Sequence, residues 1–104
     1  MNVEKYLPLT ETTFYILISL IEPGHGYSIM RKVEELSNGK VRVAAGTMYG
    51  AIEILEREQL IKSIESADKR RKVYEITAQG MKVLKSEVSR LKYLIGLAER
   101  MDLC

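Results

Sequence analysis

The chain has few of the residues that build metal and redox sites. It contains no tryptophan, one cysteine and one histidine in 104 residues. The single cysteine, Cys104, is the last residue, and with no second cysteine it has no partner for an internal disulfide. This is typical of a protein from the reducing cytosol. His25 has no second histidine, cysteine pair or compact carboxylate cluster to join it. We therefore expect no metal, no cofactor and no enzyme site, and we interpret His25 as a structural residue in a turn.

Long apolar runs are also missing. The longest, residues 14–21, is interrupted by Ser19 and is too short to cross a bilayer, and residues 1–5 lack the apolar core of a signal peptide. We therefore expect a soluble, cytoplasmic protein with no membrane contact. With 46% hydrophobic and 29% charged residues, the chain is expected to form one globular domain. A net charge of +2 does not by itself indicate nucleic-acid binding, so only local clusters of charge can do so.

The first part of the chain predicts two helices and a short strand. Apolar residues recur at three- and four-residue steps over residues 10–22, where Thr10 is suited to cap the helix, and again over residues 27–37. Pro23 and the glycine after it separate the two helices. Residues 40–44 alternate polar and apolar side chains, which predicts a minor strand. The inward residues expected are Phe14, Leu17, Ile18 and Ile21 in the first helix, and Ile29, Met30, Val33 and Leu36 in the second.

A third helix is predicted from Gly46-Thr47 to about Gln59. The threonine hydroxyl is suited to cap its first turn. Its apolar residues share one face, so that face would pack on a core and leave the other free to contact a partner. The inward residues expected are Met48, Ala51, Ile52 and Leu55, and the outward ones are Thr47, Gly50, Glu53 and Arg57.

The rest of the chain predicts a hairpin and a long helix. Residues 61–65 and 71–76 are typical of two strands, with a polar tip between them and the basic run 69–72 beside that tip. Thr77 would cap a helix that reaches about residue 101. This order predicts an α+β, mainly α fold: a winged helix-turn-helix with a two-stranded wing over residues 1–77, and a C-terminal dimerisation helix over residues 78–104, packed on the same domain.

The last helix has more apolar surface than one domain face requires. Its apolar residues follow the spacing of a coiled-coil seam, with a second stripe beside it. We therefore predict a homodimer; the alternative is that both stripes fold back on their own domain. The expected dimerisation residues are Met81, Leu84, Val88, Leu91, Leu94, Ile95, Ala98 and Met101.

Three motifs together give the chain a family resemblance. They are His25-Gly26-Tyr27, then Gly46-Thr47-Met48-Tyr49 with Leu55-Glu56 behind it, and then the stretch from Arg71 to Gly80. In this order and spacing the chain resembles the PadR family of bacterial transcriptional regulators over nearly its whole length. The resemblance implies a homodimeric repressor on a pseudo-palindromic operator, often with a small hydrophobic or aromatic effector. Compact members sandwich flat aromatic drugs with a tryptophan of the last helix, where this chain has only Tyr93 as an aromatic residue.

Candidate DNA contacts follow from charge and position. A basic run on a thin hairpin can neutralise phosphates, and hydroxyl groups at a helix start can donate to them. Tyr49 could reach DNA or pack between helices with its hydroxyl at the surface. The expected contacts with double-stranded DNA are Tyr27, Ser28, Lys40, Arg42, Thr47, Tyr49, Gly50, Glu53, Lys69, Arg70, Arg71 and Lys72.

The third helix is unusually acidic for a DNA-reading element. Between Thr47 and Gln59, three glutamates and one arginine give a net charge of −2. Related recognition helices often present basic residues where this chain has Gly50, Glu53 and Ile54. Glu53 could accept a hydrogen bond from a cytosine amino group. The alternative is an interaction module whose acidic helix faces a basic protein rather than DNA.

Overall fold

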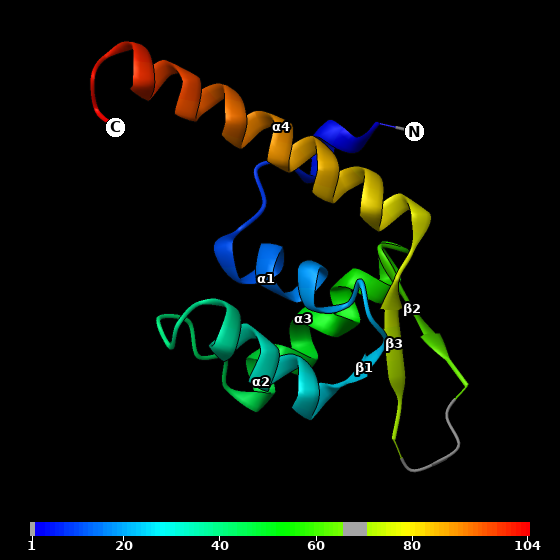
Figure 1. Ribbon diagram of the computed structural model, residues 1–104. Helices are drawn as coiled ribbons and strands as arrows, with labels where there is room; N and C mark the ends of the chain where they lie inside the picture. The colour runs from blue at the N-terminus through cyan, green and yellow to red at the C-terminus, as the bar shows by residue number, and fades with distance from the viewer. Residues whose placement is uncertain (1, 66–70) are drawn as a thin grey trace.

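The computed structural model describes residues 2–65 and 71–104. It is mainly helical, with one small antiparallel sheet (Figure 1), and this confirms the predicted winged-helix class. Within the described residues, no helix is long and apolar enough to cross a membrane. The elements in chain order are η1 (Val3–Tyr6), α1 (Glu11–Ser19), β1 (Gly24–His25), α2 (Gly26–Leu36), α3 (Ala45–Arg57), β2 (Ile61–Ile64), β3 (Val73–Ile76) and α4 (Ala78–Arg100).

The sheet has three strands in the order β1-β3-β2. The sequence predicted the two strands of the wing, although β3 begins two residues later than expected; they pair from Ile61 opposite Ile76 to Ile64 opposite Val73. The third strand, β1, pairs its two residues with Tyr74 and Val73 and was not predicted, since two residues are too few to show a periodicity. It ties the start of α2 to the wing.

The strand predicted over residues 40–44 is wrong, because this segment is an irregular connection. Its alternation has another cause. Val43 is buried and Val41 packs against the core, while the Val41 N–H donates to Ser37 Oγ at 2.9 Å instead of to a neighbouring strand.

Side-chain caps fix three of the four α-helix starts. Thr10 and Thr77 cap α1 and α4 as predicted, and His25 caps α2. The predicted cap by Thr47 is wrong: α3 begins at Ala45 behind Ala44, which makes no side-chain cap, so Thr47 already lies inside the first turn. Helix α1 also ends at Ser19, earlier than predicted, and a turn at residues 20–21 separates it from Pro23.

The core lies where α1, α2, α3 and the first half of α4 meet the sheet. In α3 the prediction is confirmed: Met48, Ile52 and Leu55 are buried, Ala51 packs beside them, and the four outward residues are exposed. In α1 and α2 it is wrong for the last residue of each stripe, because Ile21 lies beyond the end of α1 and Leu36 is the last residue of α2, and these side chains are 51% and 49% exposed. The largest fully buried side chains are Ile16, Leu17, Leu20, Ile29, Met48, Ile61, Val33 and Val83.

Helix α4 crosses over α1 and the N-terminal segment, and its C-terminal half extends beyond the rest of the molecule (Figure 1). The residues that α4 buries all lie in its first half. Leu84, predicted as a dimerisation residue, is 5% exposed and belongs to the domain core instead. Glu87 is 2% exposed, and its Oε2 accepts a hydrogen bond from the Leu9 N–H at 2.9 Å. Arg90, which donates to both oxygens of this carboxylate, lowers the pKa of Glu87, with a smaller contribution from the Leu9 N–H.

Candidate DNA interface

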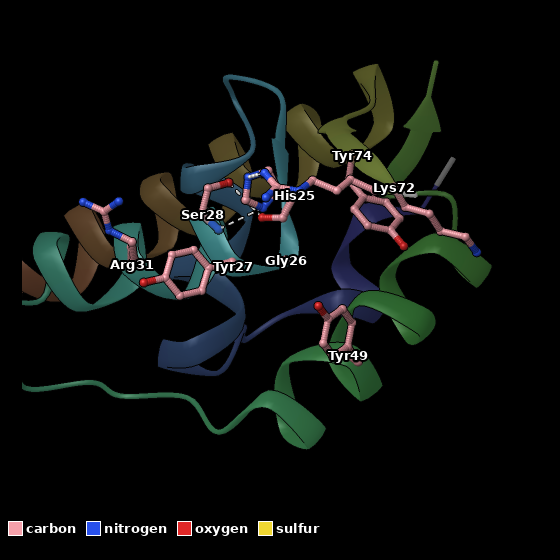
Figure 2. A pocket seen from close by; sticks show the side chains of 9 residues that line it. His25, Gly26, Tyr27, Ser28, Arg31, Tyr49, Lys72 and Tyr74 are labelled. Atoms are coloured by element: carbon pink, nitrogen blue, oxygen red, sulfur yellow. Dashed lines mark hydrogen bonds between the residues drawn. The ribbon is translucent and has the colours of Figure 1, made fainter. Parts of the chain in front are cut away.

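An open pocket of about 800 Å³ lies between the start of α2, the outer side of α3 and the foot of the wing (Figure 2). It brings together five predicted DNA contacts from three separate parts of the chain. The lining residues are His25, Gly26, Tyr27, Ser28, Arg31, Tyr49, Arg71, Lys72 and Tyr74.

His25 joins two elements of this pocket. Its Nδ1 lies 3.4 Å from the Ser28 N–H at the start of α2, and its Nε2 lies 3.2 Å from Nη1 of Arg71 beside the wing. Because a neutral imidazole accepts at one nitrogen only, the ring accepts from one of these donors at a time. The Ser28 hydroxyl donates to the His25 carbonyl at 2.8 Å and keeps the turn closed. His25 therefore makes the local hydrogen bond expected of a structural residue, but it lies at the end of β1 and caps α2 rather than lying in a turn.

Tyr49 packs between helices and still faces the pocket. A Cβ atom on Gly26 would lie 2.6 Å from the Tyr49 hydroxyl and 2.8 Å from its ring, so the ring rests directly on the first residue of α2. The side chain is nevertheless 54% exposed. The two positions weighed for Tyr49 from the sequence are thus compatible, since its ring packs against α2 while its phenol borders the pocket.

Tyr74 closes the back of the pocket. It is 6% exposed, and burial raises the pKa of its phenol, with smaller contributions from Glu56 and Tyr49. The phenol therefore keeps its proton at neutral pH and can act as a hydrogen-bond donor. In Figure 2 the hydroxyl groups of Tyr49 and Tyr74 both point into the space between α2, α3 and β3.

The positive charge of the pocket comes from the foot of the wing and from α2. Strand β3 begins at Val73, so Arg71 and Lys72 both precede it, and both line the pocket. The sequence predicted that this strand begins at residue 71 instead. Lys69 and Arg70 lie outside the described residues. Arg31 adds a third positive charge from α2, where its Nη2 lies 3.9 Å from the Glu35 carboxylate.

Five predicted contacts are exposed but lie outside the pocket lining. Lys40 and Arg42 belong to the connection between α2 and α3, where the Arg42 Nε makes a 3.2 Å ion pair with Glu34. Thr47 lies in the first turn of α3. Gly50 lies on the outward face of α3, as does the fifth such residue, Glu53.

The sequence did not single out Arg31 or Tyr74 as part of this site. Arg31 lies four residues after Tyr27, so both project from the same face of α2, and that spacing could have revealed it. The burial of Tyr74 depends on β1, which the sequence did not show. Within residues 2–65 and 71–104, no three histidine, cysteine or acidic side chains come together as possible metal ligands.

A three-helix core, a β-wing and a basic pocket between α2, α3 and the wing define a winged-helix DNA-binding regulator. The sequence model of the transcriptional regulator PadR-like family matches residues 15–86, and the chain belongs to this family. It is therefore a DNA-binding transcriptional regulator and not an enzyme.

The chain is similar to two solved regulators and to one uncharacterized protein. A transcriptional regulator from Clostridium thermocellum, Cth-833, is 25% identical, with a TM-score of 0.74 over 94% of this chain and 91% of that one. A PadR family regulator from Clostridium difficile R20291 is also 25% identical, with a TM-score of 0.70 over 86% of this chain and 96% of that one. An uncharacterized 37.1 kDa protein in a Streptomyces fradiae transposon, Tn4556, is 32% identical over 74 residues, which are 71% of this chain but only 21% of that protein.

Proposed function

We propose that the protein is a cytoplasmic repressor that binds a pseudo-palindromic operator as a homodimer. The observation that carries this proposal is the pocket in which the start of α2, the Tyr49 phenol and the foot of the wing converge. A DNA backbone held there would place α3 beside the major groove, since α3 forms the neighbouring wall.

The pocket has the chemistry of a phosphate site. The dipole at the start of α2, and the N–H groups there that His25 does not cap, favour an anion. Arg31, Arg71 and Lys72 supply positive charge, and the hydroxyl groups of Tyr27 and Tyr49 supply further donors. Tyr27 is 64% exposed, so its hydroxyl is accessible to a duplex.

The C-terminal half of α4 supports the homodimer. Its apolar side chains include Leu94 and Ile95, which are 45% and 57% exposed; Met101, which caps the helix end, is 69% exposed. Covering apolar surface stabilises an association by roughly 25 cal/mol per Å² before association entropy is subtracted. A second copy presents the same surface, so a two-fold pairing of α4 would cover both. Two-fold symmetry would then set two α3 helices about one duplex turn apart, which matches a pseudo-palindrome.

A small hydrophobic or aromatic effector is part of the same proposal. A groove of about 460 Å³ between α1 and α4 has a mainly apolar lining that includes Ile18, Ile21 and Val88. It adjoins the surface proposed for pairing, so an occupant there could change the angle between the two protomers. Thermal stabilisation by aromatic compounds, lost in Ile18→Asp, is the measurement that tests this part.

The main experiment is fluorescence-anisotropy binding to duplexes tiled across the upstream region of the gene, repeated over a salt series. We expect one tile to bind far more tightly than the rest, with log K falling linearly against log salt by about 0.9 per neutralised phosphate. Lys72→Ala should flatten that slope by about two units per dimer. Lys82→Ala is the matched control, because Lys82 is an exposed lysine of α4 away from the pocket.

Two results would count against the proposal. If all tiles bind weakly and alike, sequence-specific DNA recognition is wrong, and the interaction module with an acidic α3 and a basic protein partner becomes the better interpretation. If one tile binds but transcription from it rises when the protein is added, the repressor part is wrong while DNA recognition stands.

A further inference from the structure

Glu53 occupies the middle of the outward face of α3. It follows Tyr49 by four residues, so the two side chains lie on the same side of the helix, one turn apart. Tyr49 lines the pocket, whereas the opposite face buries Met48 and Ile52 in the core. A duplex seated in the pocket would therefore meet Glu53 next along the helix.

The Glu53 carboxylate is available to an external partner. It makes no hydrogen bond or ion pair within the part of the chain that the structure describes. Glu56 differs, because it accepts a hydrogen bond from Ser63 Oγ at 2.6 Å and so lies towards β2. Of these two acidic side chains, only Glu53 keeps its full capacity to accept hydrogen bonds.

The surface of α3 beside Glu53 carries little side-chain bulk. A Cβ atom on Gly46 or Gly50 would meet nothing within 4 Å, so internal packing does not require glycine at either position. Glycine weakens a helix relative to alanine. Two exposed glycines one turn apart let a groove approach the α3 backbone closely, which a side chain as short as glutamate needs in order to reach a base edge.

We propose that Glu53 is a specificity-determining residue that accepts a hydrogen bond from the exocyclic amino group of a cytosine in the major groove. This inference rests on the proposed function. An ionised carboxylate only accepts hydrogen bonds, and the major-groove edges of guanine and thymine present acceptors, which repel it. Adenine has an amino group but sets the acceptor N7 beside it, whereas cytosine presents its amino donor next to a C–H group.

The same carboxylate opposes binding to any sequence, since phosphates repel it. Glu53 therefore lowers the affinity for DNA of any sequence and raises the discrimination between sequences. The cationic side chains of the pocket supply the attraction to DNA. This accounts for a recognition helix that is acidic in a regulator that binds DNA.

The test begins by selecting a preferred operator from a randomised duplex library. Each cytosine of that operator is then replaced by 2-pyrimidinone, which lacks the 4-amino group. We expect one symmetry-related position at which the replacement weakens wild-type binding by roughly tenfold or more. Glu53→Ala should bind the two duplexes within about twofold and should bind random DNA more tightly than the wild type does. Glu53→Gln should move the preference at this position towards adenine, whose N6 and N7 match an amide.

Glu4→Ala is the control, because it removes an exposed glutamate of η1, far from α3 in the sequence, and should keep the wild-type preference. If the wild type shows no salt-dependent DNA binding, the proposed function fails together with this inference. If it selects an operator, yet no cytosine replacement distinguishes wild type from Glu53→Ala, the proposed function stands and the role of Glu53 is wrong.

Discussion

At the scale of single residues, Gly80 lets α4 approach the rest of the domain closely. A Cβ atom at this position would lie 2.1 Å from the Leu60 carbonyl oxygen and 2.7 Å from Ile76 Cγ1. Because the nearest atom belongs to the backbone, it cannot rotate away. We expect Gly80→Ala to lower the free energy of unfolding by about 3 kcal/mol, the upper part of the range for overpacking.

Gly50→Ala is the matched comparison. Gly50 is also helical, and its Cβ would enter open space, so this change should raise the free energy of unfolding by roughly 1 kcal/mol. Urea unfolding followed by circular dichroism measures both variants. Equal effects in the two would contradict the contact between α4 and the start of β2.

Residue-scale predictions from the sequence succeeded where periodicity alone decides which way a side chain faces. In α3 the buried and exposed residues were predicted correctly, because thirteen helical residues give a clear repeat. The contact of Tyr49 with Gly26 could not be predicted from the sequence, since it depends on how α3 lies against α2. The capping role of Thr47 failed for a related reason: a threonine inside the first turn and one in front of it look alike in sequence.

At the scale of elements, Glu87 fastens the N-terminal segment to α4. Its carboxylate accepts from the Leu9 N–H and from Arg90, whose hydrogen bond is the main cause of its lowered pKa. A carboxyl whose pKa is lower in the folded state stabilises the protein above its unfolded pKa of about 4.5. That stabilisation is lost as the pH falls through the lower, folded value.

Glu87→Gln should therefore unfold more easily than the wild type at neutral pH, by about 2 kcal/mol, the magnitude of a hydrogen bond to a charged group. The difference should shrink as the pH falls below the unfolded value of about 4.5 and through the lower, folded value, where the wild-type carboxyl gains its proton. Urea unfolding across this range measures it, with Glu99→Gln as a control for an exposed carboxylate of the same helix. A gap that does not depend on pH would mean that ionisation of Glu87 contributes nothing to the contact.

The elements themselves were predictable only where local signals were long or chemically distinct. The wing hairpin and the Thr77 cap have clear signatures in sequence. The two residues of β1 have none, because their pairing with β3 joins segments far apart in the chain. Residues 40–44 show the converse case. Their alternating polar and apolar side chains reflect the packing of Val41 and Val43 against the core, although the segment forms no strand.

At the scale of the whole molecule, α4 divides into two parts. Its first half packs into the domain, whereas its second half exposes an apolar surface. The sequence predicted the surplus of apolar residues but placed Leu84 on the pairing surface, because periodicity alone cannot show where along a helix the domain ends. The pairing surface now proposed begins near Val88, which is 36% exposed.

Because of this division, a single substitution by a charged residue can test the homodimer. Ile95 is 57% exposed in the second half of α4, so Ile95→Glu leaves the domain core intact but sets a charge into the proposed pairing surface. We expect sedimentation velocity to show a monomer at concentrations where the wild type is a dimer. The operator affinity should fall by at least a hundredfold, since one α3 then binds without the second half-site. Circular dichroism should show an unchanged helix content.

Leu36→Glu is the matched control. Leu36 is a similar aliphatic side chain, 49% exposed at the end of α2, and it lies outside both the pocket and the proposed pairing surface. It should leave the dimer and the operator affinity as they are. If Ile95→Glu also stays dimeric and binds the operator like the wild type, α4 does not pair the protomers through this surface, and the two half-sites must be read by an arrangement that leaves Ile95 in water.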